Sequence, residues 1–479
     1  MDRRSLLKQV SLATAGLVIS TSEASSRIIT HCSGTAPEIA SKGIDAEVEK
    51  HIIAKLHATD FDMSDSAYNS LNIIGDEVYY TLCTHNNDFP GRVYRYNSVT
   101  GENVLLADLG VITGEAAGKD GKKFIPHGKS HSPFYQIGDK IYFATHLSYM
   151  VAGEDGRELS PTAVPEGFLP YTGGKFFEYT PATGQFKILF SLPMGEGILT
   201  MHVDEKRALT YCFSWPSGVF WVYDIKADKL YNRGMHHRGG ENGEGEQFSC
   251  VTRHIAIDPR DGAAYFSNAD GDIMEYRHET GEVTTVNWAH LRKDVFGKWD
   301  PRKGGHDGYN WRYMVWNEKR EIFYGVHGKS GYLFSFDTKE KKMEIITRIV
   351  SEYCLKNGLY EYFRYGNMTL AQKPGDDDTL YYITDFYQFE NPTPEQARMM
   401  QQTGNPTGRG ATGYLALVTY HLPTGSYKDH GVIRMEDGRF PNSTQSIAID
   451  KNGRIYTCAW IPRTDTLPRC CQLISFSVL

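Results

Sequence analysis

The sequence predicts an all-β protein: a single-domain, seven-bladed β-propeller that follows an N-terminal export signal. The first observation is a hairpin that recurs seven times, with a short apolar strand, a tight polar turn and a return strand that carries a tyrosine. These hairpins are expected at residues 71–80, 134–143, 201–212, 255–266, 314–325, 370–383 and 447–457. Internal repeats of this kind are typical of propellers and other repeat folds.

The second observation is a third strand after each hairpin, which contains an aromatic residue. The seven copies read VYRYNSVTGE, FFEYTPATGQ, FWVYDIKADK, IMEYRHETGE, LFSFDTKEKK, LVTYHLPTGS and LISFSVL. One hairpin with its third strand corresponds to one blade, so seven copies predict seven blades. Because the last copy stops at the chain end, we expect a strand from the N-terminal side to close the ring. The repeat also outweighs the length of 479 residues, which would otherwise suggest several domains.

The first residues look like an export signal rather than part of the ring. Arg3 and Arg4 precede an apolar run over residues 10–19 and a small-residue cleavage site that ends at Ala24. We interpret them as a twin-arginine-type signal peptide, with an ordinary secretory signal as the alternative, and both predict a secreted or periplasmic protein. The expected division of the chain is a signal peptide at 1–24, an N-terminal segment at 25–66 and the propeller at 67–479.

Composition narrows the function classes. The net charge of −7 argues against a nucleic-acid partner, which normally meets a basic surface. No stretch after the signal is long and apolar enough to predict a membrane span. The eight cysteines are irregularly spaced, so they indicate no disulfide framework. Aromatic residues make up 13% of the chain, which fits either stacked sheets or a sugar-binding groove. We expect the protein to be a monomer.

Propeller geometry places the residue that opens the first strand of a blade beside the residue that closes the second strand, at one rim of the central channel. The expected openers are Tyr68, His131, Thr200, Arg253, Arg312 or Tyr313, Asn367 and Gln445. The expected closers are His85, His146, Trp215, Asn268, His327, Asp385 and Trp460. Long insertions at 111–130, 150–175, 286–310, 346–366 and 389–411 fall at the same rim, which is therefore the predicted functional face.

Three histidines converge on this rim in the second repeat. His131 and His146 should face each other across one strand pair, and His127 lies in the entry loop just before them. An imidazole with an ordinary pKa near 6.5 can take or give a proton at neutral pH. The alternative is a set of hydrogen-bonded loop histidines.

Other rim residues suit an acidic sugar. Arg253 opens an inner strand, where a guanidinium can bind a carboxylate with two hydrogen bonds or instead bridge two blades. Arg312 and Arg233 are weaker versions of the same argument. Trp215 is positioned to stack on a sugar ring. Tyr211 is a candidate acid or base, although a tyrosine occupies the matching position of every repeat, which favours a structural role in the blade.

A second group of residues suggests a structural zinc site. His237, Cys250, His290 and His306 provide imidazole and thiolate ligands, which suit tetrahedral zinc. Their spacing is non-local and matches no compact zinc motif, so polar loop residues and a buried cysteine are the alternative. No nucleotide-binding loop, serine-hydrolase elbow or paired carboxylates on the functional face are found, which disfavours a two-carboxylate glycosidase.

Several phrases resemble the seven-bladed propeller polysaccharide lyases, in particular the ulvan lyases and more distantly the oligogalacturonate lyases. The phrases are GKSHSPFYQIGDKIYFATH, YCFSWPSGVFWVYD, WRYMVWNEKREIFYGVHGKSGYLFSFD and VTYHLPTGSYKDHGVIRMEDGRFPNSTQSIAID. The resemblance spans nearly the whole mature chain, and much of it is blade repeat. It implies β-elimination at a uronic acid, with an Arg or His that neutralises the carboxylate and a His or Tyr pair that moves the protons.

Residue by residue, the resemblance matches His131 or His127 with His146 to the family's paired histidines. It matches Tyr211 to the family's tyrosine and Arg253 or Arg233 to its neutralising arginine. The family's structural zinc falls on His237, Cys250, His306 and His290.

The leading hypothesis is therefore an exported lyase that acts on an acidic, ulvan-like and sulfated polysaccharide. The alternatives are a non-catalytic carbohydrate- or protein-binding propeller and a metal-dependent oligouronide lyase whose histidines hold a catalytic cation. The converging histidines favour an enzyme.

Overall fold

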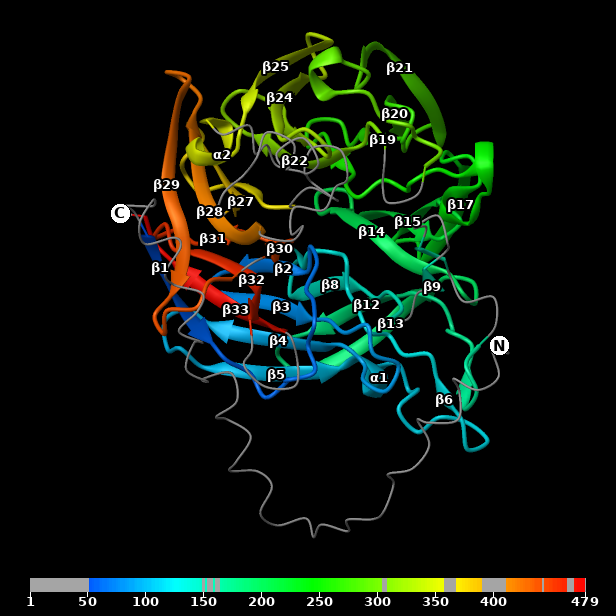
Figure 1. Cartoon of the computed structure of the whole chain (residues 1–479). Helices are drawn as coiled ribbons and strands as arrows, with labels where there is room; N and C mark the ends of the chain where they lie inside the picture. Colours follow the sequence, from blue (N-terminus) through cyan, green and yellow to red (C-terminus); the bar gives the residue numbers. More distant parts are fainter. Residues whose placement is uncertain are drawn as a thin grey trace, which may run out of the picture.

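The computed structural model describes residues 51–148, 151–152, 158–159, 164–303, 308–356, 368–389, 411–441, 443–462 and 469–478. Over these residues the chain is almost entirely β-structure, and its sheets follow one another in chain order around a propeller-like ring (Figure 1). The predicted all-β class and propeller architecture are confirmed. The predicted signal peptide, residues 1–24, lies outside the described residues.

Five sheets have four strands each. The first contains β2 (Leu71–Ile74), β3 (Glu77–Leu82), β4 (Arg92–Asn97) and β5 (Asn103–Asp108), and the second contains β7 (Tyr135–Ile137), β8 (Lys140–Ala144), β12 (Lys175–Thr180) and β13 (Gln185–Ser191). The third contains β14 (Gly197–Asp204), β15 (Leu209–Trp215), β16 (Val219–Asp224) and β17 (Lys229–Met235), and the fourth contains β18 (Ala256–Ile257), β19 (Ala264–Ser267), β20 (Asp272–Arg277) and β21 (Glu282–His290). The fifth contains β22 (Trp311–Asn317), β23 (Ile322–His327), β24 (Tyr332–Asp337) and β25 (Lys342–Arg348).

The last two repeats belong to one nine-stranded sheet. Its strands are β26 (Leu370–Gln372), β27 (Thr379–Phe389), β28 (Ala411–His421), β29 (Ser426–Met435), β1 (His51–His57), β33 (Arg469–Phe476), β32 (Ile455–Pro462), β30 (Ser443–Thr444) and β31 (Ala448–Ile449). Strand β1 pairs in parallel with β29 and antiparallel with β33, so the predicted closure by an N-terminal strand is confirmed (Figure 1). The structure has five separate four-stranded blades and not the predicted seven, because β1 joins the strands on either side of it into one sheet.

The repeated hairpins are present as predicted. Each of the seven is an antiparallel strand pair. The first two hairpins turn at Gly75 and Gly138, whose φ values of 65° and 60° are strained for residues with a Cβ. Because the turns are fixed in this way, the residues at the open end of each hairpin are brought together at the opposite rim.

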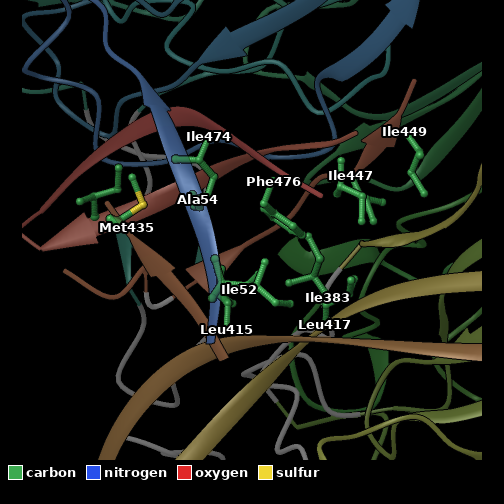
Figure 2. Close-up of a cluster of buried hydrophobic side chains, with 14 of the residues drawn as sticks. Ile52, Ala54, Ile383, Leu415, Leu417, Met435, Ile447, Ile449, Ile474 and Phe476 are labelled. Atoms are coloured by element: carbon green, nitrogen blue, oxygen red, sulfur yellow. The ribbon is translucent and has the colours of Figure 1, made fainter. Parts of the chain in front are cut away.

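Buried apolar side chains fill the spaces between neighbouring strands and sheets. Figure 2 shows the cluster around the closing strand, where Ile52 and Ala54 of β1 lie among side chains from β28, β29 and β33. Complete burial of one aliphatic side chain stabilises the folded state by about 1.5–3 kcal/mol. The closing strand is therefore held by packing as well as by its two hydrogen-bonded neighbours.

Short elements decorate the ring. Two two-stranded sheets pair β6 (Lys123–Phe124) with β11 (Phe168–Leu169) and β9 (Val151–Ala152) with β10 (Glu158–Leu159). The helices are α1 (Leu109–Ile112), α2 (Glu352–Lys356), η3 (Gly240–Asn242), η4 (Gly245–Gln247) and η5 (Asp294–Phe296). Within the described part of the chain, none of these helices has the length and apolar character needed to cross a membrane.

Candidate active site at the channel rim

His131 and His146 come together where the second sheet meets the rim. Their ring centroids are 4.7 Å apart and their planes are inclined at 61°. His131 precedes β7 and His146 follows β8, so the antiparallel register of this hairpin sets their approach. A backbone bridge between Lys129 and His146 extends the pairing beyond the regular strands. The predicted convergence of these two imidazoles is observed.

Burial and nearby positive charge keep His131 neutral. Both of its ring nitrogens are buried, and neither has a hydrogen-bond partner among the described residues. Burial lowers the pKa of His131 well below its ordinary value, and the charges of His146, Lys129, Arg253 and His85 lower it further. A neutral imidazole offers a lone pair, so His131 can accept a proton at neutral pH.

The neighbouring repeat contributes a second pair. Tyr68 stacks on His131 with ring centroids 4.0 Å apart and an interplanar angle of 21°. The Tyr68 hydroxyl is hydrogen-bonded to His85 Nε2 at 3.0 Å. His85 Nδ1 in turn lies 2.8 Å from Asp65 Oδ1. Tyr68 and His85 are the expected opener and closer of the first repeat, so the same geometric rule holds in two adjacent sheets.

Glu241 fixes two of the predicted site residues. Its carboxylate accepts a hydrogen bond from Trp215 Nε1 at 2.6 Å and another from the Arg253 guanidinium at 3.0 Å. Arg253 also donates to the carbonyl of Val251 at 2.6 Å. The Trp215 ring meets His146 edge-on, with centroids 5.5 Å apart. These contacts hold Trp215 against the histidine pair and fix Arg253 between the third and fourth sheets. From this position the charge of Arg253 acts on His131.

Arg312 lies at the start of β22 and is also buried. Its positive charge, together with that of Arg253, acts on the Cys250 thiol, although burial is the larger influence and raises the pKa of that thiol to about 12. The two buried guanidinium groups therefore belong to one region, in which the buried carboxylate of Glu241 pairs with Arg253. The ammonium of Lys129 is also buried and lies 5.9 Å from the centroid of the Tyr68 ring.

His127 lies apart from the histidine pair in a network of its own. It is fully buried, and its Nδ1 is 2.8 Å from the Thr145 hydroxyl and 3.0 Å from that of Tyr171. Its Nε2 faces Glu115, with a closest separation of 3.3 Å, and Lys175 lies 3.6 Å from the same carboxylate. This network ties the 111–130 insertion to the second sheet, which is the structural alternative considered for His127.

Tyr211 and Arg233 are not at the rim. The Tyr211 hydroxyl donates to the carbonyl of Gly262 at 3.3 Å, and the ring is fully buried in a core between the third and fourth sheets. Arg233 lies on the outer strand β17, where its guanidinium stacks over Tyr231 and Tyr276 at 4.7 and 5.7 Å. Neither residue contacts His131 or His146 among the interactions found in the described residues.

The predicted zinc ligands are only partly brought together. His237 has both ring nitrogens buried without a partner among the described residues, and burial lowers its pKa to about 3. Cys250 is buried, and the charge of Arg253 acts on both residues. His290 ends β21 opposite Asp272, and His306 lies outside the described residues. Within the described residues, no group of three or more potential ligands is arranged so that it could hold a metal ion.

Five site residues are not candidates in the sequence analysis: Asp65, Tyr68, His85, Lys129 and Glu241. Tyr68 and His85 are expected rim residues without an assigned role. Asp65, Lys129 and Glu241 lie in irregular segments just outside the repeats, so periodicity carries no signal for them. Only the fold brings their charges to the rim.

Comparisons with known proteins place no family name on the chain. No family model matches it, and no curated protein matches it. Among solved structures, the GH74 enzyme of Niastella koreensis is similar at 12% identity over 87% of this chain and 55% of that chain, with a TM-score of 0.48. A chain of a mitotic checkpoint complex is similar at 12% identity over 97% of this chain and 100% of that chain, with a TM-score of 0.46. Similarities this distant carry no argument about activity.

Proposed function

We propose that this chain is an exported lyase that cleaves a uronic-acid-containing, ulvan-like and sulfated polysaccharide by β-elimination at the channel rim. One observation carries the proposal: a neutral His131, whose two ring nitrogens are buried, lies against His146 within reach of the positive charges of Lys129 and Arg253. A uronate brings a carboxylate that needs neutralising and an adjacent C–H bond that needs a base. The rim offers both in one place.

The chemistry follows from these residues. Arg253 and Lys129 neutralise the carboxylate, which makes the C5 proton more acidic. His131 takes that proton, the C4–O4 bond breaks, a C4=C5 double bond forms, and O4 leaves with a proton supplied by a second donor at the rim. His146 orients His131 or exchanges the proton with it, and Trp215, which is fully buried and not open to stack on a sugar ring, packs edge-on against His146. Arg312 is assigned to binding further negative charge on the polymer.

His127, Tyr211 and Arg233 have a smaller place in this proposal than the resemblance gives them. Their side chains are engaged in networks and packing away from His131. Tyr211 and Arg233 act on the reaction only through the blades that carry the rim.

A non-catalytic carbohydrate-binding propeller is the second candidate. The observation that favours it is the anchoring of Arg253 and Trp215 by Glu241, a rigid arrangement that also suits recognition without chemistry. A metal-dependent lyase, in which the rim histidines hold a cation, is distinguished by the effect of a chelator on activity.

We also infer that the nine-stranded sheet represents two blades that are joined through β1, which gives seven blades in the ring. The strands β26-β27-β28-β29 form one four-stranded unit, and the other five strands, β1-β33-β32 with the short strands β30 and β31, form the second unit. The arginine pair and the apolar run in residues 1–24 support export to the periplasm or medium. A monomer is proposed because the ring closes on its own strand.

A structural zinc remains part of the proposal. The two nitrogens of His237, which have no hydrogen-bond partner among the described residues, fit a metal ligand, and Cys250 supplies a thiol. His290 does not join them in a group of three, and His306, which lies outside the described residues, is proposed as a further ligand. Zinc at this position holds loops together and takes no part in the proton transfers. Elemental analysis is expected to find about one zinc per chain. A chain without zinc and with unchanged thermal stability in chelator contradicts this assignment.

The proposed activity is tested with the purified mature protein on ulvan, pectate, alginate and glycosaminoglycans. A C4=C5 unsaturated uronate absorbs ultraviolet light, so its appearance reports elimination directly. We expect a signal with at least one of these polymers. Binding without any unsaturated product favours the binding-propeller candidate.

A further inference from the structure

Asp65, His85 and Tyr68 form a continuous hydrogen-bonded chain that ends against His131. Asp65 Oδ1 lies 2.8 Å from His85 Nδ1, and Asp65 Oδ2 accepts the backbone N–H of His85 at 3.0 Å. His85 Nε2 lies 3.0 Å from the Tyr68 hydroxyl. The Tyr68 ring then stacks on the His131 ring at 4.0 Å. Nothing in the proposed function so far uses this chain of groups.

The carboxylate fixes the direction of the chain. Burial raises the pKa of Asp65, but the hydrogen bonds and charge of His85 outweigh it and leave that pKa below its usual value. An ionised Asp65 only accepts hydrogen bonds, so His85 carries a proton on Nδ1. The carboxylate also favours the doubly protonated imidazolium, whose Nε2–H can donate to the oxygen of Tyr68.

The chain is partly open to solvent, unlike the tyrosine that the sequence favoured. The side chains of Asp65 and His85 are 34% and 35% exposed, whereas Tyr211 is fully buried with its hydroxyl bound to a backbone carbonyl. Tyr68 therefore combines three properties of a proton donor: a hydroxyl at the rim, an imidazole ring hydrogen-bonded to that hydroxyl and a position against the residue that takes the first proton.

We propose that Tyr68 is the second proton-transferring residue of the rim, with His85 and Asp65 as the relay that positions it and stabilises its anion. This inference rests on the proposed elimination. His131 removes the C5 proton, the C4–O4 bond breaks, and O4 takes the hydroxyl proton of Tyr68. The tyrosinate accepts a hydrogen bond from His85 Nε2–H. Return of the proton from His131 to Tyr68, by way of water, restores both groups.

The test uses the full mature chain with Tyr68→Phe, Asp65→Asn and the control Tyr80→Phe. Tyr80 lies in the same sheet, is buried, and donates its hydroxyl to Asn103 at 2.8 Å, so its substitution removes a comparable group away from the rim. We expect Tyr68→Phe to lower the elimination rate by about 10² or more, as for a lost acid or base, and Tyr80→Phe to keep it. If Tyr68→Phe does not fold, His85→Gln carries the same expectation.

Asp65→Asn separates a positioning role from a purely structural one. Among the described residues, Asp65, Ser66 and Tyr68 lie within hydrogen-bond distance of the His85 ring, and the charge of His85 lowers the pKa of His131 in part. Without the carboxylate the imidazolium is less favoured, so the alkaline limb of the rate profile should move to lower pH. An unchanged profile overturns the relay.

A readout without substrate keeps the two proposals distinguishable. Nitrogen and proton NMR of the histidine rings should show a slowly exchanging Nδ1–H of His85 in the wild type that is lost in Asp65→Asn. Wild-type cleavage together with full activity of Tyr68→Phe overturns the relay alone. A wild type that cleaves no uronate polymer overturns the proposed function, and with it the catalytic role of Tyr68, even where the NMR signal is present.

Discussion

His131 and His146 face each other across a single strand pair, with ring centroids 4.7 Å apart. The two residues are 15 positions apart in the chain, and the hairpin of β7 and β8 returns one to the other. Gly197 packs so closely against His146 that a Cβ at this position would overlap the imidazole. The close packing fixes the ring of His146 and, through it, the position of His131.

Substitution of either histidine by alanine should lower elimination activity by about 10²–10⁴, the usual loss for an acid or base. His131→Ala removes the proton acceptor, and His146→Ala removes the ring that packs against it. Initial rates at saturating substrate measure the effect. His278→Ala is the control, because His278 lies in the turn between β20 and β21 of the fourth sheet and is paired with Glu279. Wild-type rates in both rim variants contradict the assignment.

Arg253→Lys should be costly although it keeps the positive charge. The guanidinium donates at once to Glu241 and to the Val251 carbonyl, and a single ammonium cannot hold both directions and meet a substrate carboxylate. We expect a lower kcat/KM with a folded protein. Circular dichroism checks the fold, and steady-state kinetics of wild type and variant provide the comparison. Unchanged kinetics would remove Arg253 from the site.

Tyr211→Phe should leave turnover close to that of the wild type. The phenol is buried in a core, and its hydroxyl bonds only the carbonyl of Gly262 among the interactions found in the described residues. Loss of that hydrogen bond should cost about 1 kcal/mol of stability. Urea denaturation and kinetics on the same sample measure both quantities. A large loss of turnover at unchanged stability would restore Tyr211 as an acid or base.

Buried histidines should make the fold sensitive to acid. Burial lowers the pKa of His202 to about 3 and that of His327 to about 3, from 6.5 in the unfolded chain. Below pH 6.5 the unfolded state binds protons that the folded state does not, so stability is complete above 6.5 and falls as the pH drops towards about 3. The free energy of unfolding falls by at most about 1.4 kcal/mol per pH unit for each histidine.

The His202→Gln variant isolates one of these contributions. His202 Nδ1 lies 2.7 Å from the Tyr135 hydroxyl, a contact that a glutamine oxygen can accept. Urea denaturation at a series of pH values should give a shallower loss of stability for the variant than for the wild type. Parallel curves would show that the pKa of His202 is the same in the folded and the unfolded state.

The repeat made the fold and half of the site predictable. Strand register follows from the hairpin turns, so the meetings of His131 with His146 and of Tyr68 with His85 could be expected from sequence positions alone. The repeat places a tyrosine at the position of Tyr211 in every blade, and in the structure this side chain is buried in a core. The fusion of the last two repeats by β1 depends on hydrogen bonds to two neighbours at once, which no local pattern reports. The roles of Lys129 and Glu241 depend on loop placement, for which the sequence has no period.

The central claim is that this rim breaks a glycosidic linkage by elimination and not by addition of water. Cleavage of a uronate polymer in water enriched in heavy oxygen distinguishes the two, because only a hydrolase transfers solvent oxygen to the new chain end. Mass spectrometry of the products should show an unsaturated uronate, lighter than the hydrolysis product by one water, with no heavy oxygen introduced by cleavage. Saturated products that carry heavy oxygen from the cleavage step would contradict the account.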